Sequence, residues 1–210
     1  IVLKKRKEFK MLMALLCMIT SVGFLTSCGT EKQAKAKPEK EVAKDEKNPI
    51  SDVLPLEFVY SSGAGAWQSI ITLNSDGSFK GTYSDAEMGS NGEDYPNGTV
   101  YTCEFSGKFE EIKQVNDYTY TMTLAEVTTE KKEGEEWIED QIRYIAAGPF
   151  GLESGKEFLF YTPETPIKEL SEEFLNWWPK RYLQEEQALE KLSCYGIYNK
   201  ETESGFFTSE

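Results

Sequence analysis

The stretch YTCEFSGKF, residues 101–109, places Tyr, Cys, Phe, Gly and Phe at every second position, with polar residues between them. The stretch YTYTMTLA, residues 118–125, repeats this alternation. Successive side chains of a β-strand point to opposite faces, so a period of two with one apolar face predicts a half-buried strand. These two segments therefore predict an all-β fold.

The segments on either side predict more strands, joined by short turns. Residues 67–73 and 79–84 alternate around Ser75-Asp76-Gly77, which is typical of a tight hairpin. Many short strands in succession favour an antiparallel up-and-down β-barrel of about eight strands, with a sandwich as the alternative. The other predicted strands are 56–60, 141–146, 157–162, 194–199 and 205–208.

One helical segment interrupts the predicted strands. Ser171 can cap its N-terminus, and Pro179 ends it because proline disfavours helix in the residue before it. A second short helix is predicted around residues 183–192. We expect the first helix to cover one end of the barrel with its apolar side; a platform for stacking a carbohydrate or other ligand is the alternative. Its apolar stripe consists of Leu170, Phe174, Trp177 and Trp178.

The N-terminal segment is typical of a secretion signal and not of the fold. A basic cluster precedes the mostly apolar run 12–25, and small residues follow it. The sequence Leu25-Thr26-Ser27-Cys28 resembles the lipobox of bacterial lipoproteins. This resemblance implies cleavage before Cys28, a diacylglyceryl anchor on its sulfur, and a cell-membrane location on the extracytoplasmic face. An ordinary secretion signal or an uncleaved anchor remains the alternative.

These patterns divide the chain into three parts. Residues 1–27 are predicted to be the lipoprotein signal peptide. Residues 28–49 contain the lipidated Cys28 and a Lys- and Glu-rich stretch without aromatic residues, which predicts a disordered charged tether. Residues 50–210 are the predicted barrel domain, a length that suits one hydrophobic core.

The charge and composition exclude several classes of function. The net charge of the 210-residue chain is −13, and removal of residues 1–27 takes away five basic residues and one acidic one, which leaves −17. Such a surface repels phosphate backbones, so we expect no nucleic-acid partner. The chain has no histidine, which removes Ser-His-Asp and Cys-His sites and nearly all zinc catalysis. We expect no catalytic residue, metal or cofactor; a carboxylate-dependent hydrolase is the remaining catalytic alternative.

Two cysteines remain for the folded domain, Cys103 and Cys194. A disulfide between them is permitted outside the cell. Cys103 lies on the predicted inner face of its strand, whereas Cys194 points outward if Tyr195 and Ile197 point inward. The parity therefore favours two separate thiols, with the disulfide as the alternative.

The loop 84–98 is long for a hairpin and rich in carboxylate and amide side chains. A mobile loop at the barrel mouth, a calcium site and a cover over a pocket are three interpretations. In the third, Tyr95 is the apolar tip of the cover. We expect Tyr83, Tyr95 and Tyr101 to contact a bound ligand.

Gly65-Ala66-Trp67, with the hairpin that follows, resembles the Gly-x-Trp start of lipocalins and of small lipocalin-like bacterial lipoproteins. The resemblance implies an eight-stranded barrel with an apolar cavity open at one end. It also implies that the tryptophan packs against an arginine from a late strand. Only Arg143 and Arg181 follow the signal segment.

The predicted function is a non-catalytic binding module for a small hydrophobic or amphipathic molecule. The alternative is a protein-interaction or envelope-structural module with a filled barrel and an envelope protein as partner. An internal cavity above roughly 300 Å³ favours the first. A packed barrel with an exposed apolar patch favours the second.

Overall fold

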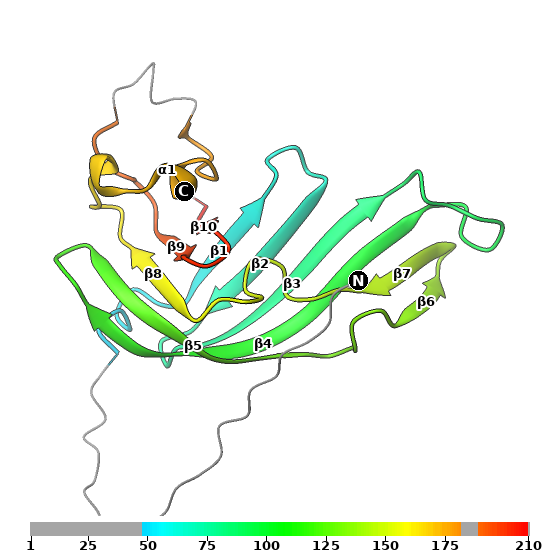
Figure 1. Cartoon of the computed structure of the whole chain (residues 1–210), viewed down its shortest axis with the longest axis horizontal. Coiled ribbons are helices and arrows are strands. Elements are labelled where there is room, and N and C mark those ends of the chain that lie inside the picture. Colours follow the sequence, from blue (N-terminus) through cyan, green and yellow to red (C-terminus); the bar gives the residue numbers. More distant parts are fainter. Residues whose placement is uncertain (1–47, 182–188, 210) are drawn as a thin grey trace, which may run out of the picture. The chain divides into compact units, whose positions relative to one another are not determined.

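The computed structural model describes residues 48–181 and 189–209, all within one compact unit, Lys44–Glu210 (Figure 1). The lipobox, Cys28 and residues 1–47 lie outside the described residues. The elements are β1 (Leu56–Ser61), β2 (Trp67–Leu73), β3 (Ser78–Glu87), β4 (Thr99–Gln114), β5 (Thr119–Thr129), β6 (Glu136–Glu139), β7 (Ile142–Ala146), β8 (Glu157–Tyr161), a 3-10 turn η1 (Ile167–Glu169), α1 (Glu172–Leu175), β9 (Gly196–Asn199) and β10 (Ser204–Phe207).

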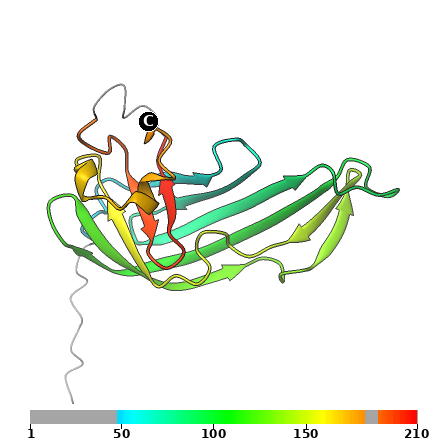
Figure 2. The same cartoon turned by 45° about the horizontal axis from the view of Figure 1, so that its top comes forward.

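Eight of these strands close into an antiparallel up-and-down barrel (Figure 2). Their order around the barrel is β1-β2-β3-β4-β5-β8-β9-β10, and β10 returns to β1 through the pair Val59↔Phe207. The seven strands predicted at 56–60, 67–73, 79–84, 101–109, 118–125, 157–162 and 205–208 all belong to it, as does 196–199 within the predicted 194–199. The predicted all-β, lipocalin-like barrel is therefore confirmed.

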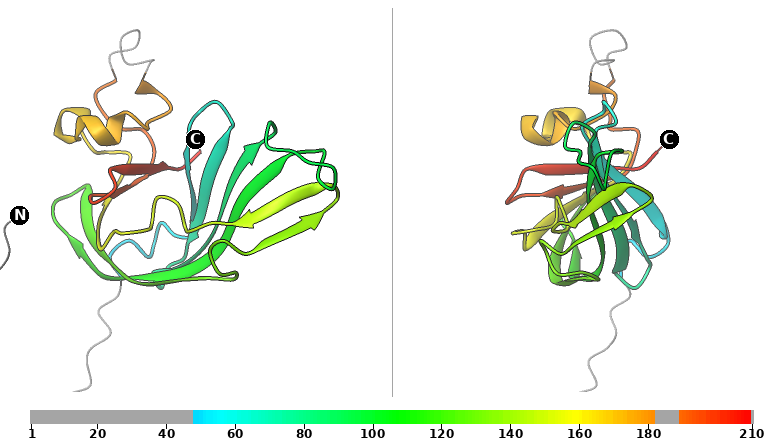
Figure 3. Two further views of the ribbon diagram at one scale, coloured as in Figure 1. Left: turned by 45° about the vertical axis from the view of Figure 1, so that its right-hand side comes forward. Right: turned by 90° about the vertical axis from the view of Figure 1, so that its right-hand side faces the viewer.

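The segment 141–146 is a strand but not a barrel strand. β7 pairs with the first residues of β4, from Thr99↔Arg143 to Thr102↔Ala146, and it runs parallel to β4 rather than antiparallel. β6, which the sequence pattern did not predict, pairs antiparallel with β7. β3 and β4 extend beyond the barrel. Figure 3 shows them curving away from it, with β6 and β7 beside their far end. We call β6, β7 and the adjoining ends of β3 and β4 the sheet extension.

The barrel interior is packed with aromatic rings. Phe109 contacts Phe79 and Phe158, with both pairs of ring centroids 5.0 Å apart. Alternation places these side chains inward, as the period of two predicts. The fully buried interior side chains include Phe58, Phe79, Phe109, Phe158, Phe160, Phe206, Ile71, Leu73 and Met122.

Two glycines let β3 and β4 approach their neighbours closely. A Cβ on Gly81 would lie 2.5 Å from the Phe105 ring, and one on Gly107 would lie 2.5 Å from the Phe79 ring. Each ring therefore covers the glycine directly opposite on the neighbouring strand. Glycines at such positions allow strong bending of a strand, which a small barrel requires.

The first predicted helix and its predicted cap are present, but most of its apolar side packs on the outside of the barrel wall. The Ser171 hydroxyl accepts a hydrogen bond from the Phe174 backbone N–H at 3.2 Å. Phe174 and Trp178 pack on the outer face of β8, β9 and β10, in one cluster with Tyr161, Tyr198 and Phe207. Trp177 packs instead against Tyr60 at the β1–β2 end of the barrel, with ring centroids 4.8 Å apart. Trp177 therefore agrees with the expected packing over a barrel end, whereas Phe174 and Trp178 do not, because these three strands carry aromatic side chains on their outer face as well.

Most of the second predicted helix, 183–192, lies outside the described residues. Its last residues, 189–192, are described and are not helical. Leu192 is fully buried in the outer cluster, and Lys191 forms an isolated bridge with Pro166.

The two cysteines are separate, as strand parity predicts. Cys103 belongs to the interior cluster, whereas Cys194 belongs to the cluster outside the barrel wall. Tyr195 and Ile197 pack with the interior cluster, so Cys194 faces the other way. The alternative of a Cys103–Cys194 disulfide is wrong.

Candidate functional site

The barrel has two different ends because its strands alternate in direction. The connections β1–β2, β3–β4 and β9–β10 lie at one end, which we call the mouth. The β2–β3 turn lies at the opposite end, where the Asn48 side-chain amide donates a hydrogen bond to the Ser75 carbonyl at 2.9 Å. The described chain therefore enters the barrel domain at the end opposite the mouth.

The connection from β7 to β8 fills the mouth. Its residue Phe150 stacks on Tyr60 at 5.6 Å between ring centroids and contacts the rings of Trp67 at 5.0 Å and Tyr83 at 5.2 Å. Leu152 is 1% exposed and belongs to the interior cluster. We call residues 149–155 the plug.

Polar anchors hold the plug to the barrel wall. The Ser69 hydroxyl donates to the Phe150 carbonyl at 2.6 Å, and the buried Asn199 amide donates to the Gly151 carbonyl at 2.9 Å. A Cβ on Gly151 would lie 2.8 Å from the Phe206 ring, so the plug backbone lies directly on the interior side chains. The interior is thus filled up to the mouth.

Trp67 has aromatic partners in place of the arginine that the lipocalin resemblance implies. Its ring contacts Tyr60 at 4.8 Å and Trp177 at 6.0 Å, in addition to Phe150. Arg143 lies against Tyr95, and Arg181 bonds to Glu172 and Asn176 next to α1. The implied tryptophan–arginine pair is therefore absent.

A carboxyl group lies among the aromatic side chains of the mouth. The Oε2 atom of Glu153 is buried and has no hydrogen-bond partner among the described residues. Burial raises the pKa of this carboxyl above its ordinary value. Burial, followed by the charges of Asp85 and Glu153, raises the pKa of Tyr83 to about 12, so its hydroxyl is neutral at physiological pH.

The sheet extension continues the inner surface of the barrel beyond the plug. Two cross-strand rows lie on this surface: Asp85, Tyr101, Ile145 and Glu136 form one, and Glu87, Thr99, Arg143 and Ile138 form the other. We call these eight residues the mouth face. The Tyr101 hydroxyl donates to the Glu87 carboxylate at 3.5 Å, and the Arg143 Nε donates to the Thr99 hydroxyl at 3.2 Å, as expected for side chains on one face.

The three tyrosines predicted to contact a ligand lie along this surface but do not form one pocket. Tyr83 is held under the plug by Phe150. Tyr101 is half-buried on the mouth face itself. Tyr95 covers the far end, with the Arg143 guanidinium 4.6 Å from its ring centroid. The alternation along the strands correctly predicted that Tyr83 and Tyr101 lie on the inner face. The position of Tyr95 depends on the fold of its loop, which alternation does not predict.

The loop predicted at 84–98 is shorter in the structure, because β3 continues to Glu87. The Thr99 hydroxyl donates to the Ser90 carbonyl at 2.6 Å, and Asn97 N–H donates to the Gln141 carbonyl at 3.1 Å. The loop is thus bonded to the sheet extension rather than laid over the plug. In the described part of the chain, no three Cys, Asp or Glu side chains gather closely enough to hold a metal ion.

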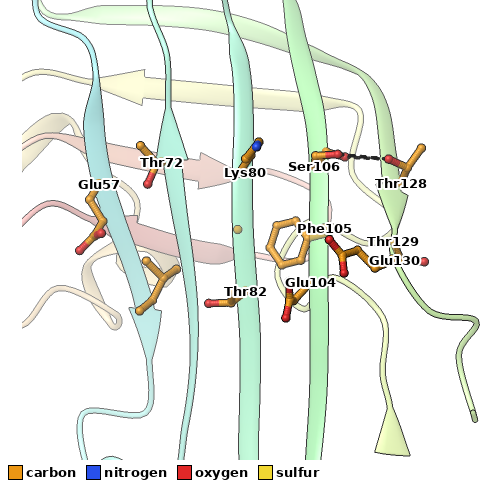
Figure 4. A pocket seen from close by; sticks show the side chains of 12 residues that line it. Glu57, Thr72, Lys80, Thr82, Glu104, Phe105, Ser106, Thr128, Thr129 and Glu130 are labelled. Carbon is orange, nitrogen blue, oxygen red and sulfur yellow. Dashed lines mark hydrogen bonds between the residues drawn. The ribbon is translucent and has the colours of Figure 1, made fainter.

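A second concave surface lies on the outside of the barrel (Figure 4). It is a shallow groove of about 660 Å³ across β1 to β5. One cross-strand row supplies Glu57, Thr72, Lys80, Ser106 and Thr128, all exposed to solvent. The side chains are short hydroxyls and solvated charges, so this surface can form hydrogen bonds but shields nothing from water.

Cys103 borders a small cavity of about 60 Å³ between β4 and β7. Burial, with the charges of Glu133 and Glu104, raises the pKa of its thiol to about 11. Because the thiolate is the nucleophilic form, this cysteine is unreactive at neutral pH.

The class defined by this geometry is an eight-stranded, lipocalin-like β-barrel with a filled interior. A scan against protein-family models, a search of curated proteins and a search of solved structures each returned no match.

Proposed function

We propose that this chain is a lipid-anchored extracytoplasmic lipoprotein, and that its barrel is a non-catalytic module that binds an envelope protein through the mouth face. One observation carries the second part: the plug fills the barrel up to its mouth with Phe150 and Leu152. An eight-stranded barrel either holds one small ligand or is filled by side chains, and this one is filled.

A small molecule inside the barrel would have to displace the plug. Entry would separate Phe150 from three aromatic rings and break the hydrogen bonds from Ser69 and Asn199. A partner on the mouth face needs no such change. That face offers the half-buried Tyr101 and Arg143 and the exposed Ile138, and aromatic residues and arginine are enriched at protein interfaces.

The proposal of a lipid anchor is based on the lipobox-like sequence that ends at Cys28. None of the described helices has the length and hydropathy to cross a bilayer.

Replacing Cys28 by alanine tests the anchor. In cells fed a labelled fatty acid, Cys28→Ala is expected to lose the label completely and to leave the membrane fraction on washing at high salt. The matched control is Cys17→Ala, which changes a cysteine within the predicted signal and is expected to keep label and location. A labelled Cys28→Ala protein contradicts the proposal.

A photo-crosslinking amino acid at position 101 tests the mouth face. In the native host, the variant at Tyr101 is expected to form a protein adduct of defined mass. The same substitution at Thr72, in the outer groove, is expected to form none. Native mass spectrometry of the full chain, purified in detergent from that host, is expected to show no additional small molecule. Lack of the Tyr101 adduct, or a small molecule that co-purifies, overturns this function in favour of a small-molecule carrier.

A further inference from the structure

The sheet extension has one open edge. Each barrel strand has a neighbouring strand on both sides for at least part of its length, whereas β6 ends the sheet order and pairs only with β7. No other described segment lies along its free side. An open strand edge presents unpaired backbone groups to which another strand can be added.

The hairpin geometry decides which backbone groups face outward. The β6–β7 turn has only two residues, Asp140 and Gln141, both with positive φ (51° and 65°), as in a type I′ hairpin. In such a hairpin, the pairs Glu139↔Ile142 and Trp137↔Tyr144 exchange hydrogen bonds. The N–H and C=O groups of Glu136 and Ile138 therefore face the open side.

The open edge is held in place by its other side chains. The Trp137 ring stacks on Tyr144 at 5.2 Å with an angle of 11° between the planes. The Lys131 ammonium lies 4.7 Å from the centroid of the Trp137 ring, and it pairs with Glu135 at 3.3 Å. The edge is thus formed before any partner arrives, which lowers the ordering cost of binding.

The side chains of β6 specify the chemistry of an added strand. Ile138 is 50% exposed at the centre of the edge, and the carboxylates of Glu136 and Glu139 flank the pair Trp137-Ile138. Residues directly opposite on neighbouring strands interact, and opposite charges stabilise the pair. The complementary segment therefore reads basic, apolar, apolar, basic, in either strand direction.

We propose that β6 accepts an extended segment of this basic–apolar–apolar–basic pattern from the partner protein, as an added strand of the sheet extension. This inference rests on the proposed protein-binding function of the mouth face, to which Glu136 and Ile138 belong. A second copy of this chain fits the edge poorly. Pairing β6 with its own copy centred on Trp137 and Ile138 would put Glu136 opposite Glu139, and like charges directly opposite destabilise a strand pair.

Synthetic peptides test the edge on the full chain in mild detergent. The probe is acetyl-Ser-Lys-Val-Val-Lys-Ser-amide carrying a fluorophore, and fluorescence anisotropy measures its dissociation constant. The double variant Glu136→Lys/Glu139→Lys is expected to weaken binding at least tenfold and to bind the Glu-Val-Val-Glu counterpart instead. The matched control is Glu57→Lys/Glu104→Lys, which makes the same charge change in the outer groove and is expected to alter binding less than threefold.

Two further peptides separate strand addition from charge attraction alone. A version with N-methyl groups on both valines removes backbone donors and is expected to bind at least tenfold more weakly. A version with the order Val-Lys-Lys-Val keeps the composition and is expected to bind similarly weakly. Equal binding of all three peptides overturns the inference, and so does a wild-type dimer that Glu136→Lys dissociates.

The two proposals can fail separately. If the Lys-Val-Val-Lys peptide does not bind but the Tyr101 adduct forms, strand addition at β6 is wrong and the mouth-face function stands. If the Tyr101 adduct does not form, the protein-binding function is wrong whatever the peptides do.

Discussion

Replacing Phe158 by alanine is expected to lower the free energy of unfolding by about 3–5 kcal/mol. The Phe158 side chain is 0% exposed, contacts the Phe109 ring at 5.0 Å, and faces Met122 on the neighbouring strand. Its removal leaves a cavity that Phe109 and Met122, fixed on β4 and β5, cannot close. Single domains are typically stable by about 5–15 kcal/mol, so this loss is a large fraction of the total.

Urea denaturation followed by tryptophan fluorescence measures this loss. The control is Val115→Ala in the β4–β5 turn, where the side chain is 59% exposed, and its effect is expected to stay within about 0.5 kcal/mol. A Phe158→Ala effect below about 1 kcal/mol would contradict a fully packed interior, and with it the argument for binding outside the barrel.

Replacing Gly107 by alanine is expected to cost about 1–3 kcal/mol, near the upper end of that range. An added Cβ would lie 2.4 Å from the Glu126 carbonyl oxygen and 2.5 Å from the Phe79 ring. The ring can turn, but the carbonyl belongs to the ladder between β4 and β5 and cannot move without separating the strands. Phe79→Leu in the same chain is therefore expected to restore only part of the loss.

The matched control for Gly107→Ala is Gly89→Ala, where an added Cβ would meet nothing within 4 Å. We expect that change to be neutral or to stabilise the protein slightly, by up to about 1 kcal/mol, because alanine restricts the unfolded chain. The same urea titration measures both variants. Equal stability of the two variants would contradict the close β4–β5 approach.

Local alternation predicted most of the barrel because a barrel strand has one inner and one outer face. Residues 101–109 and 118–125 fall in β4 and β5. The same parity placed Cys103 and Cys194 on opposite sides of the barrel wall. It also placed Tyr83 and Tyr101 on the inner surface, and of these two Tyr101 belongs to the mouth face.

The elements that alternation missed are those whose position depends on distant partners. The plug sequence, Pro-Phe-Gly-Leu-Glu-Ser-Gly, has no period of two and is typical of a loop. Phe150 turns inward because its ring packs against Tyr60, Trp67 and Tyr83, and Leu152 is buried in the interior cluster. These contact residues are distant from the plug in the sequence, so no local pattern predicts the packing.

The outer cluster carried a signal that could have been found. Gly205-Phe206-Phe207 in β10 has two consecutive phenylalanines, and both are buried. Consecutive large apolar residues in a strand indicate burial on both faces. They therefore predict a cover on the outside of the barrel, which Phe174 and Trp178 provide.

Local sequence patterns predicted the barrel, the helix cap at Ser171 and the separation of the two thiols, because each follows from neighbours in the chain. Three features follow instead from contacts between distant parts of the chain: the plug fills the mouth, β7 pairs parallel to β4, and β6 has an open edge. These features depend on which strands extend beyond the closed barrel and on which distant side chains pack together at its mouth. Alternation with a period of two predicts on which face of the sheet a side chain lies. It does not predict where along a strand the pairing with a neighbouring strand ends.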